Sequence, residues 1–394
     1  MAENPQQVLD FLTDLAKRAR PQGEKELAQL RAFAKAEFGV DELQPWDIAY
    51  YSEKQKQHLY SISDEQLRPY FPENKAVNGL FEVVKRIYGI TAKERTDIDV
   101  WHPDVRFFEL YDDKNELRGS FYLDLYAREN KRGGAWMDDC VGQMRKADGS
   151  LQKPVAYLTC NFNRPVNGKP ALFTHDEVIT LFHEFGHGLH HMLTRIETAG
   201  VAGISGVPWD AVELPSQFME NWCWEKEALD FISGHFETHE PLPEEKLNQL
   251  LKAKNYQAAM FVLRQLEFGL FDFTLHHTFE PGKANQVLDT LKAVKDKVAV
   301  IKGVEWARTP HSFSHIFAGG YAAGYYSYLW AEVLSADAFS RFEEEGIFNP
   351  ITGKSFLDEI LTRGGSEEPM VLFKRFRGRE PQLDALLRHK GIAN

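Results

Sequence analysis

The sequence has few cysteines and no long hydrophobic run. The three cysteines, Cys140, Cys160 and Cys223, are far apart in 394 residues, which argues against a disulfide framework and against a cysteine-based metal site. No stretch approaches the roughly eighteen uninterrupted apolar residues of a membrane-spanning helix. Residues 1–7 lack the basic-then-apolar order of a signal peptide. We therefore expect a soluble protein of the cytoplasm.

Basic residues are also scarce relative to acidic ones. The 46 Lys and Arg residues against 58 Asp and Glu residues give a formal net charge of −12. This charge disfavours nucleic acid and anionic membranes as partners. We expect the acidity to form a solvated surface, and attraction of basic peptides is the alternative. The hydrophobic content of 43% is that of an ordinary globular protein.

The strongest chemical signal is the segment His183-Glu184-Phe185-Gly186-His187. On an α-helix, two histidines four residues apart lie on one face and can share a tetrahedral Zn²⁺ ion. Glu184 leans toward the same face, where it is a natural base for the attacking water. The motif predicts a metal-dependent hydrolase that cuts peptide bonds. The alternative is a buried helix with two hydrogen-bonded core histidines.

The motif requires a helix, and the flanking sequence predicts one. Thr174 and Glu177 have the spacing of a capping box, and apolar residues follow at helical intervals up to about Leu193. Gly186 and Gly188 each lower helix propensity by roughly 1 kcal/mol relative to alanine. Glycines beside the histidines indicate close approach of another backbone or of a ligand.

A catalytic zinc site of this kind needs a carboxylate as third ligand and leaves its fourth position to water. The candidates lie between Trp209 and Glu220, where helical periodicity places Glu213, Gln217 and Glu220 on one side. The spacing alone allows either Glu213 or Glu220. Asp210 is expected to cap this second helix or to orient a ligating imidazole.

A second candidate site lies downstream, around Gly319 and Gly320. Tyr321, Tyr325 and Tyr328 fall at i, i+4 and i+7, which predicts one stripe of a helix that begins at Tyr321 and follows a flexible glycine hinge. A phenol aimed at the carbonyl oxygen of a peptide would stabilise the tetrahedral intermediate by roughly 2.7–4 kcal/mol. The alternative is ordinary packing of tyrosine rings.

Together these motifs resemble peptidase family M3, the zinc oligopeptidases of the thimet oligopeptidase type, and in particular its bacterial branch. The family pattern is an HEFGHxxH helix followed by a VExPSQ helix, matched here by residues 183–190 and 212–217. The resemblance implies that one Zn²⁺ ion is held by His183, His187 and Glu213.

The resemblance also implies roles for the remaining site residues. Glu184 is the implied catalytic base, and Glu220 is a neighbour without a ligand role. The family's histidine, Gly-Gly-Tyr and YYxYLW elements match residues 315–330, which implies that Tyr321 and Tyr328 contact the oxyanion. The implied substrate-binding residues are His315, Gly319, Gly320 and Tyr325. The remaining histidines are expected to be structural or surface groups; they include His190, His191, His276 and His277.

The implied activity is that of a zinc-dependent endopeptidase that hydrolyses short unstructured peptides without a covalent acyl-enzyme. The alternatives are a dipeptidyl carboxypeptidase of the same family and a non-catalytic metal-binding protein. Members of the family carry a long helical N-terminal region to which nothing here corresponds. We therefore expect weak activity of the chain alone, and self-association or pairing with such a region.

The predicted fold is mainly α (α+β), a helical zincin-type catalytic domain with a small β-sheet beside the active site. Helical patterns predict a helical segment over residues 1–100 that packs on a catalytic domain at 101–394. Within this domain we expect the sheet at about 104–162, the zinc helices at about 174–227 and a C-terminal helical part at about 243–394.

The strand signals predict how the sheet is used. Residues 105–111 and 119–126 form a predicted hairpin, and residues 155–162 form a further strand. This strand precedes the zinc helix, so it is expected either to pair with extended substrate at a sheet edge or to be an internal strand. The C-terminal segment 376–381, which resembles a family signature, is expected to be structural.

Overall fold

The computed structural model describes residues 2–304 and 306–392. The chain forms two compact units. Unit 1 contains Met1–Ser63, Gln249–Val333 and Leu383–Asn394, and unit 2 contains Asp64–Asn248 and Leu334–Gln382. The predicted helical segment 1–100 thus contributes to both units.

Unit 1 is built from helices around a large apolar core and a smaller one at Leu30, Ala34 and Leu43. Helix α1 (Pro5–Phe38) begins where the side chain of Asn4 accepts a hydrogen bond from the N–H of Gln7, and it ends at Gly39 in the left-handed conformation. It packs along α10 (Ala258–Thr278). Their shared core includes Leu12, Leu15, Ala19, Val262, Leu266 and Phe271. The other helices are α2 (Ile48–Tyr60), α11 (Gln286–Val298), η4 (Thr309–Ser312), α12 (Ser314–Phe317) and α16 (Asp384–His389).

Two helices extend across the boundaries between the units. Helix α9 (Glu244–Ala253) passes the boundary at residue 248, and α13 (Ser327–Glu345) passes the boundary at residue 333.

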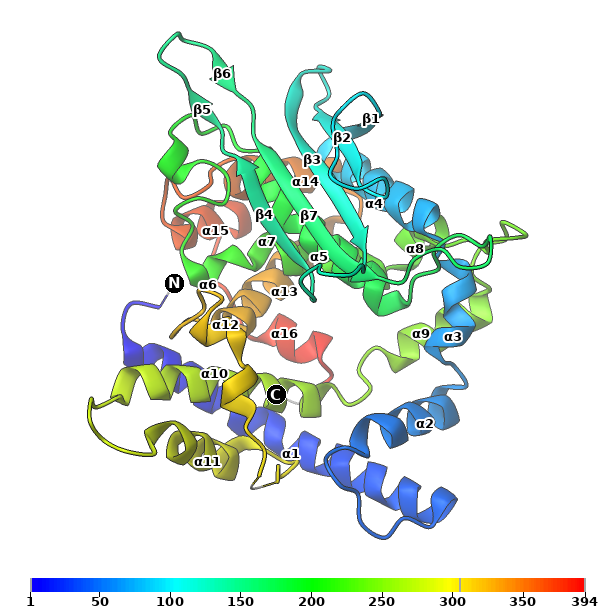
Figure 1. The fold of residues 1–394 in the computed structure, drawn as a ribbon, viewed down its shortest axis with the longest axis vertical. Coiled ribbons are helices and arrows are strands. Elements are labelled where there is room, and N and C mark those ends of the chain that lie inside the picture. The colour runs from blue at the N-terminus through cyan, green and yellow to red at the C-terminus, as the bar shows by residue number, and fades with distance from the viewer. Residues whose placement is uncertain (1, 305, 393–394) are drawn as a thin grey trace. The chain divides into compact units, whose positions relative to one another are not determined.

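Unit 2 contains a five-stranded sheet with the order β1-β2-β3-β7-β4 (Figure 1). Strands β3 and β7 are parallel, and the other neighbours are antiparallel. The strands are β1 (Thr91–Arg95), β2 (Arg106–Tyr111), β3 (Leu117–Tyr126), β4 (Trp136–Val141) and β7 (Val155–Phe162). A separate ribbon pairs β5 (Met144–Arg145) with β6 (Leu151–Gln152). The predicted hairpin is confirmed as β2 and β3, and the predicted strand at 155–162 is confirmed as β7.

One face of the sheet is packed against helix α5 (His175–Met192). The contact is aromatic, because the ring of Phe185 on α5 lies edge-on to Phe121 of β3, with the ring centroids 5.3 Å apart. Both side chains are fully buried. Phe81, on α4 (Glu73–Tyr88), joins the same cluster. The sheet therefore supports the helix that carries the HExxH motif.

The rest of unit 2 is helical. The further elements are α3 (Asp64–Leu67), η1 (Arg68–Tyr70), η2 (Ala199–Val201), α6 (Trp209–Val212), α7 (Leu214–Glu220), η3 (Asn221–Trp224), α8 (Lys226–Ile232), α14 (Pro350–Phe356), the π-helical turn η5 (Leu357–Leu361) and α15 (Pro369–Arg377). The predicted class, mainly α with a small sheet, is confirmed. No helix in the described ranges has both the length and the apolar character needed to span a membrane.

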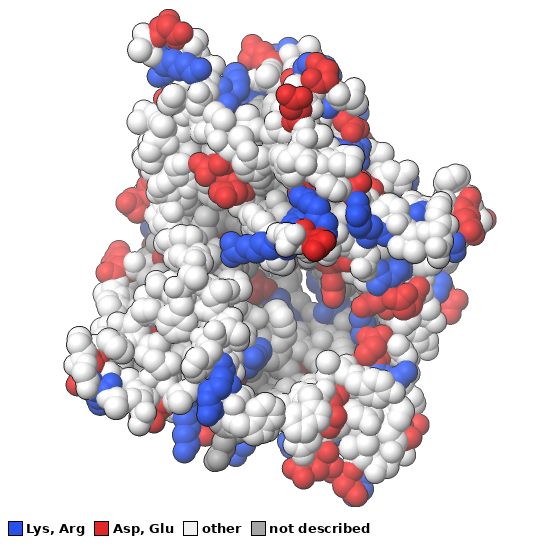
Figure 2. All heavy atoms as spheres, in the orientation of Figure 1, with Lys and Arg blue, Asp and Glu red and all other residues white. Residues whose placement is uncertain are grey.

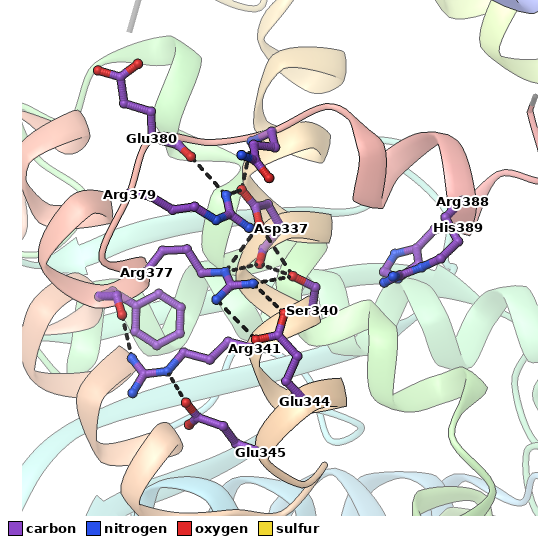
Figure 3. A network of polar contacts seen from close by, with 12 residues as sticks. Asp337, Ser340, Arg341, Glu344, Glu345, Arg377, Arg379, Glu380, Arg388 and His389 are labelled. Carbon is purple, nitrogen blue, oxygen red and sulfur yellow. Dashed lines mark hydrogen bonds and ion pairs between the residues drawn. The ribbon is translucent and has the colours of Figure 1, made fainter. Parts of the chain in front are cut away.

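An ionic network around the buried carboxylate of Asp337 ties the C-terminal segment of unit 2 to α13 (Figure 3). The carboxylate of Asp337 is buried and accepts two hydrogen bonds from the guanidinium of Arg379, each 2.6 Å long. It also accepts from the backbone N–H of Gln382 at 2.8 Å, and Arg377 lies 3.3 Å from it. A buried carboxylate needs partners of this kind. These contacts agree with the structural role expected for segment 376–381.

Candidate metal centre

Helix α5 begins as its sequence predicts. The hydroxyl of Thr174 accepts a hydrogen bond from the N–H of Glu177 at 3.1 Å, and the carboxylate of Glu177 accepts one from the N–H of Thr174 at 2.8 Å. This capping box satisfies two N–H groups that the first turn would otherwise leave unpaired. The helix then continues through the HExxH motif to Met192, so both motif histidines lie on regular helix.

The structure brings His183, His187 and Glu213 together. Oε2 of Glu213 lies 3.3 Å from Nε2 of His183 and 3.1 Å from Nε2 of His187. One ligand atom from each residue can be chosen so that all lie within 4.8 Å of one another. Tetrahedral bonds of about 2.0–2.1 Å would place donor atoms about 3.3 Å apart. The donor set and its spacing therefore fit a zinc ion.

The close approach of α7 to α5 depends on Gly186. A Cβ atom at this position would lie 2.4 Å from the carbonyl oxygen of Pro215 and 2.6 Å from Cα of Ser216. The backbone of α7 therefore runs directly against α5, which carries Glu213 to the histidines. The prediction that a glycine here permits close approach of another backbone is confirmed. A Cβ atom at Gly188 would meet only side-chain atoms, at 3.1 Å or more.

The charges at the centre stabilise one another. Glu213 is buried, which by itself raises its pKa, but the imidazoles of His187 and His183 hold the pKa well below its usual range. Burial lowers the pKa of His183, but its hydrogen bonds to Glu213 and Glu220 raise it well above its usual range. A divalent cation would take the place of the imidazole protons, because metal ligands must be deprotonated.

Glu184 lies in a different environment from Glu213. Its carboxyl group is buried, and burial raises its pKa, although the charges of His183 and His187 act in the opposite direction. It is also hydrogen-bonded to the backbone of Met137 in β4. A carboxylate with a raised pKa is better suited to take up and release a proton near neutral pH.

Glu220 contacts the metal centre indirectly. Its Oε1 accepts a hydrogen bond from Nδ1 of His183 at 2.7 Å, an arrangement that fixes the orientation of an imidazole and leaves Nε2 for a metal. Sequence spacing allowed either Glu213 or Glu220 to be the third ligand. In the structure Glu213 lies beside Nε2 of both histidines, whereas Glu220 lies beside Nδ1 of His183. Asp210 is buried in the first turn of α6, two residues beyond the N-cap position, which is occupied by Pro208.

The other histidines near the motif are buried and lie outside the ligand cluster. Burial lowers the pKa of His190 to about 3, so this side chain is neutral. His191 places Nε2 3.0 Å from the carbonyl oxygen of Val141. Both arrangements agree with the structural role expected for these residues.

The sheet edge beside the centre is β4, a strand that the sequence pattern did not predict. Strand β7 lies between β3 and β4, so of the two alternatives the internal strand is confirmed and the edge strand is wrong. The outer side of β4 has no neighbouring strand in the described part of the chain. Gly133, Gly134 and adjacent Asp138 and Asp139 weaken the strand signal of this segment, which explains why its pattern was not recognised.

The predicted tyrosine site lies in unit 1, where its helix begins later than expected. Helix α13 starts at Ser327, so Tyr321 and Tyr325 belong to a turn segment that precedes it. The rings nevertheless cluster, with Tyr321 and Tyr328 stacked at 5.1 Å and Tyr325 also 5.1 Å from Tyr328. The prediction of a single helical stripe is therefore wrong, although the three side chains are neighbours.

His315 and the two glycines precede these tyrosines. The ring of His315 is 5.9 Å from that of Tyr325, and its carbonyl oxygen accepts from the N–H of Tyr321 at 3.0 Å. A Cβ atom at Gly319 would lie 3.0 Å from the backbone of His315, and Gly320 has φ of 87°. The backbone of Gly320 therefore favours glycine, and a side chain at Gly319 would be tightly packed against His315.

A mainly helical chain with a small mixed sheet, an HExxH helix and a neighbouring glutamate has the fold of a zincin-type metallopeptidase. In agreement, a solved structure from Bacillus anthracis described as oligoendopeptidase F shares the fold, with a TM-score of 0.57 at 15% identity over 99% of this chain and 56% of that chain. More specifically, the chain belongs to peptidase family M3, whose family model matches residues 1–392.

Two relatives define the similarity further. The chain is 87% identical over 392 residues to oligopeptidase A of Escherichia coli (strain K12), which covers 100% of this chain and 58% of that protein. It is 36% identical over 397 residues to dipeptidyl carboxypeptidase of the same organism, covering 100% of this chain and 57% of that protein. The chain thus spans less than two thirds of the length of these relatives.

Proposed function

We propose that the chain is a zinc-dependent endopeptidase that hydrolyses short unstructured peptides with water as the nucleophile. The observation that carries this proposal is the cluster of His183, His187 and Glu213. The buried carboxyl group of Glu184 lies on the same helix as the two histidines. Membership of family M3 and the high identity to an oligopeptidase support the same activity.

The proposed ligands of the metal are Nε2 of His183, Nε2 of His187 and Oε2 of Glu213. Two imidazoles and one carboxylate are a donor set typical of catalytic zinc, and they leave one coordination position for solvent or substrate. When bound there, Zn²⁺ would supply a Lewis acid and lower the pKa of a coordinated water to about 7. Glu220 would keep His183 in the orientation that directs Nε2 to the metal.

Glu184 is the proposed general base. Its carboxylate takes a proton from the attacking water and then delivers the proton to the departing amine. Burial, which raises its pKa, makes this proton easier to accept and keeps competing solvent away. No serine or cysteine nucleophile is required, so we expect no covalent acyl-enzyme.

The tyrosine cluster is proposed to act on the carbonyl side of the scissile bond. The hydroxyls of Tyr321 and Tyr328 would donate hydrogen bonds to the oxyanion of the tetrahedral intermediate. His315 and Tyr325, with the backbone at Gly319 and Gly320, would bind the substrate. The clustering of the tyrosine rings within unit 1 supports a shared role.

The outer edge of β4 is proposed to bind the substrate backbone. An extended peptide that added to this edge would pair with the backbone of the strand by β-augmentation. Such a peptide would lie close to Glu184, because this carboxyl group is hydrogen-bonded to Met137 of β4. Unstructured peptides can adopt this extended conformation, whereas folded proteins cannot.

Metal analysis combined with mass spectrometry of peptide digests tests the proposal. We expect one zinc ion per chain and internal cleavage of a peptide blocked at both ends. The 36% identical dipeptidyl carboxypeptidase motivates the second candidate activity, which would release C-terminal dipeptides from a free-ended peptide and leave the blocked one intact. Zinc binding without any cleavage, in the presence of intact Glu184, would favour a non-catalytic role.

A further inference from the structure

We call the turn segment Ala318–Tyr326 the glycine–tyrosine loop. Its backbone donates two hydrogen bonds to the carboxylate of Asp272. We infer that Asp272, on α10, is a positioning residue that holds this loop in the conformation in which Tyr321 acts on the substrate. The inference rests on the role proposed above for Tyr321. Asp272 lies on a helix that carries none of the motifs described above.

Asp272 makes the two contacts that such a role requires. Its Oδ1 accepts a hydrogen bond from the N–H of Ala323, and its Oδ2 accepts one from the N–H of Tyr325, both 2.9 Å long. The Asp272 side chain is fully buried. Two backbone groups only two residues apart are therefore held by the two oxygens of one carboxylate, which fixes the direction of the loop at this point.

The carboxylate is itself oriented within α10. Nδ1 of His276, one turn further along the helix, lies 2.9 Å from Oδ1 of Asp272. Burial raises the pKa of Asp272 above its usual value, although the backbone hydrogen bonds from Tyr325 and Ala323 and the charge of His276 act in the opposite direction. Each of its two oxygens accepts one backbone N–H, so these contacts are suited to hold a strained turn.

The loop needs this anchor because its backbone is strained at the contact. Ala323 has φ of 54°, in the left-handed region that residues with a Cβ atom rarely adopt. Gly324 follows it, and its N–H donates to the carbonyl oxygen of Tyr321 at 2.8 Å. The hydrogen bonds to Asp272 therefore offset the cost of a conformation that the loop would otherwise leave.

The anchored backbone sets the positions of the tyrosine rings. The hydroxyl of Tyr325 donates to the side chain of Gln265, also on α10, at 3.0 Å. Tyr321 stacks on Tyr328 at the start of α13. Movement of the loop backbone at Ala323 would therefore shift Tyr321 relative to a ring outside the loop.

A matched pair of substitutions separates positioning from stability. In Asp272→Asn, the amide retains one acceptor oxygen and turns an NH₂ group toward the second N–H donor. The control is Glu26→Gln, because Glu26 is also buried in unit 1 and accepts from two backbone N–H groups, those of Ala259 and Met260 at the start of α10. Both variants lose the same kind of hydrogen bond, but only Asp272 holds the loop.

We expect Asp272→Asn to lower kcat by about 10- to 100-fold with a smaller change in KM, since a displaced catalytic group affects mainly the transition state. Zinc content should remain one per chain. Glu26→Gln should leave kcat within about threefold of wild type at a similar loss of unfolding free energy. Equal effects of the two variants on kcat would overturn the inference.

A double-mutant cycle tests whether Asp272 acts through Tyr321. If it does, Asp272→Asn should change kcat by less than about threefold when it is added to Tyr321→Phe, because the effects of coupled residues are not additive. Fully multiplicative effects would contradict the inference. If Tyr321→Phe alone leaves kcat unchanged, the proposed oxyanion role of Tyr321 fails. Hydrogen exchange then tests separately whether Asp272 holds the loop.

Hydrogen exchange measures the anchor without reference to activity. In Asp272→Asn, amides of residues 318–326 should exchange about 10- to 100-fold faster than in wild type, the factor expected for the loss of one hydrogen bond to a charged group. Glu26→Gln should leave these amides unchanged. Unchanged protection of residues 318–326 in Asp272→Asn would show that Asp272 does not position the loop.

Discussion

At the scale of single residues, the candidate centre distinguishes three glutamates by their surroundings. Glu213 lies against both motif imidazoles, Glu220 accepts a hydrogen bond from the far nitrogen of one of them, and Glu184 is buried beside them on the same helix. Identical side-chain chemistry is thus expected to serve as ligand, as orienting group and as base. Each assignment can be tested by replacing one carboxylate with its amide.

Glu184→Gln should retain one zinc per chain and the wild-type unfolding transition, while kcat falls by about 10²- to 10⁴-fold. The amide has nearly the same shape, but it cannot accept the proton of the attacking water. Metal analysis and the hydrolysis rate of a quenched fluorescent peptide measure the two properties. Activity within a few-fold of wild type would mean that another group is the base.

Glu213→Gln should weaken zinc binding much more than Glu220→Gln. The first change replaces a charged ligand, whereas the second keeps an amide oxygen that still accepts from Nδ1 of His183, and a change of this kind costs about 10- to 100-fold in affinity at most. Titration against a competing zinc chelator measures both affinities. Equal loss of metal in the two variants would refute the ligand assignment.

Tyr321→Phe and Tyr328→Phe should each lower kcat by about 10²- to 10³-fold with little change in KM. Only the hydroxyl is removed, and a hydrogen bond to the oxyanion forms fully only in the transition state. Steady-state kinetics on one peptide separate the two constants. A rise in KM with an unchanged kcat would assign these tyrosines to substrate binding instead.

At the scale of elements, the decisive contact is that between α5 and α7. Gly186→Ala should lower the unfolding free energy by about 1–3 kcal/mol and weaken zinc binding, because the added methyl group meets the rigid backbone of Pro215 and Ser216. Gly188→Ala is the control on the same helix, since its methyl group meets only the ends of the Leu158 and Met192 side chains.

Denaturant unfolding with and without zinc measures the effect of both alanine variants. The gain in helix propensity is about 1 kcal/mol for each, so any difference between them comes from the contact. Similar stability and zinc affinity of the two variants would show that the approach of α7 does not depend on Gly186.

At the scale of the whole molecule, two properties affect which molecules the chain can bind. They are its surface charge and its length relative to its relatives. Acidic and basic side chains are interspersed on the face shown in Figure 2, without one continuous patch of either sign. This agrees with the expectation that the net charge of −12 forms a solvated surface. The chain also covers only 58% of the length of E. coli oligopeptidase A, so the rest of that relative can be supplied as a separate polypeptide.

We expect the chain alone to cleave short peptides weakly, and we expect its activity to rise when the N-terminal part of that relative is added in trans. Additional walls around the site would supply contacts that orient a peptide for attack. Light scattering and peptide hydrolysis measure association and activity together. A monomer whose full activity is unchanged by the added part would contradict this prediction.

The sequence by itself determined the elements whose signals are local. The capping box at Thr174, the i, i+4 histidines of α5, the hairpin of β2 and β3 and the strand β7 all follow from patterns within a few residues, since capping, helical periodicity and strand alternation act at short range. The resemblance carried by these motifs was sufficient to indicate the family.

Only the tertiary structure decided the features that depend on contacts between distant segments. It placed Glu213 against both imidazoles and Glu220 behind one of them, because Gly186 admits the backbone of α7. It made β4 the sheet edge, and it delayed the start of α13, where Asp272 holds a left-handed turn at Ala323 that is 51 residues away in sequence. Periodicity cannot predict such contacts, because each depends on where a second, distant segment packs.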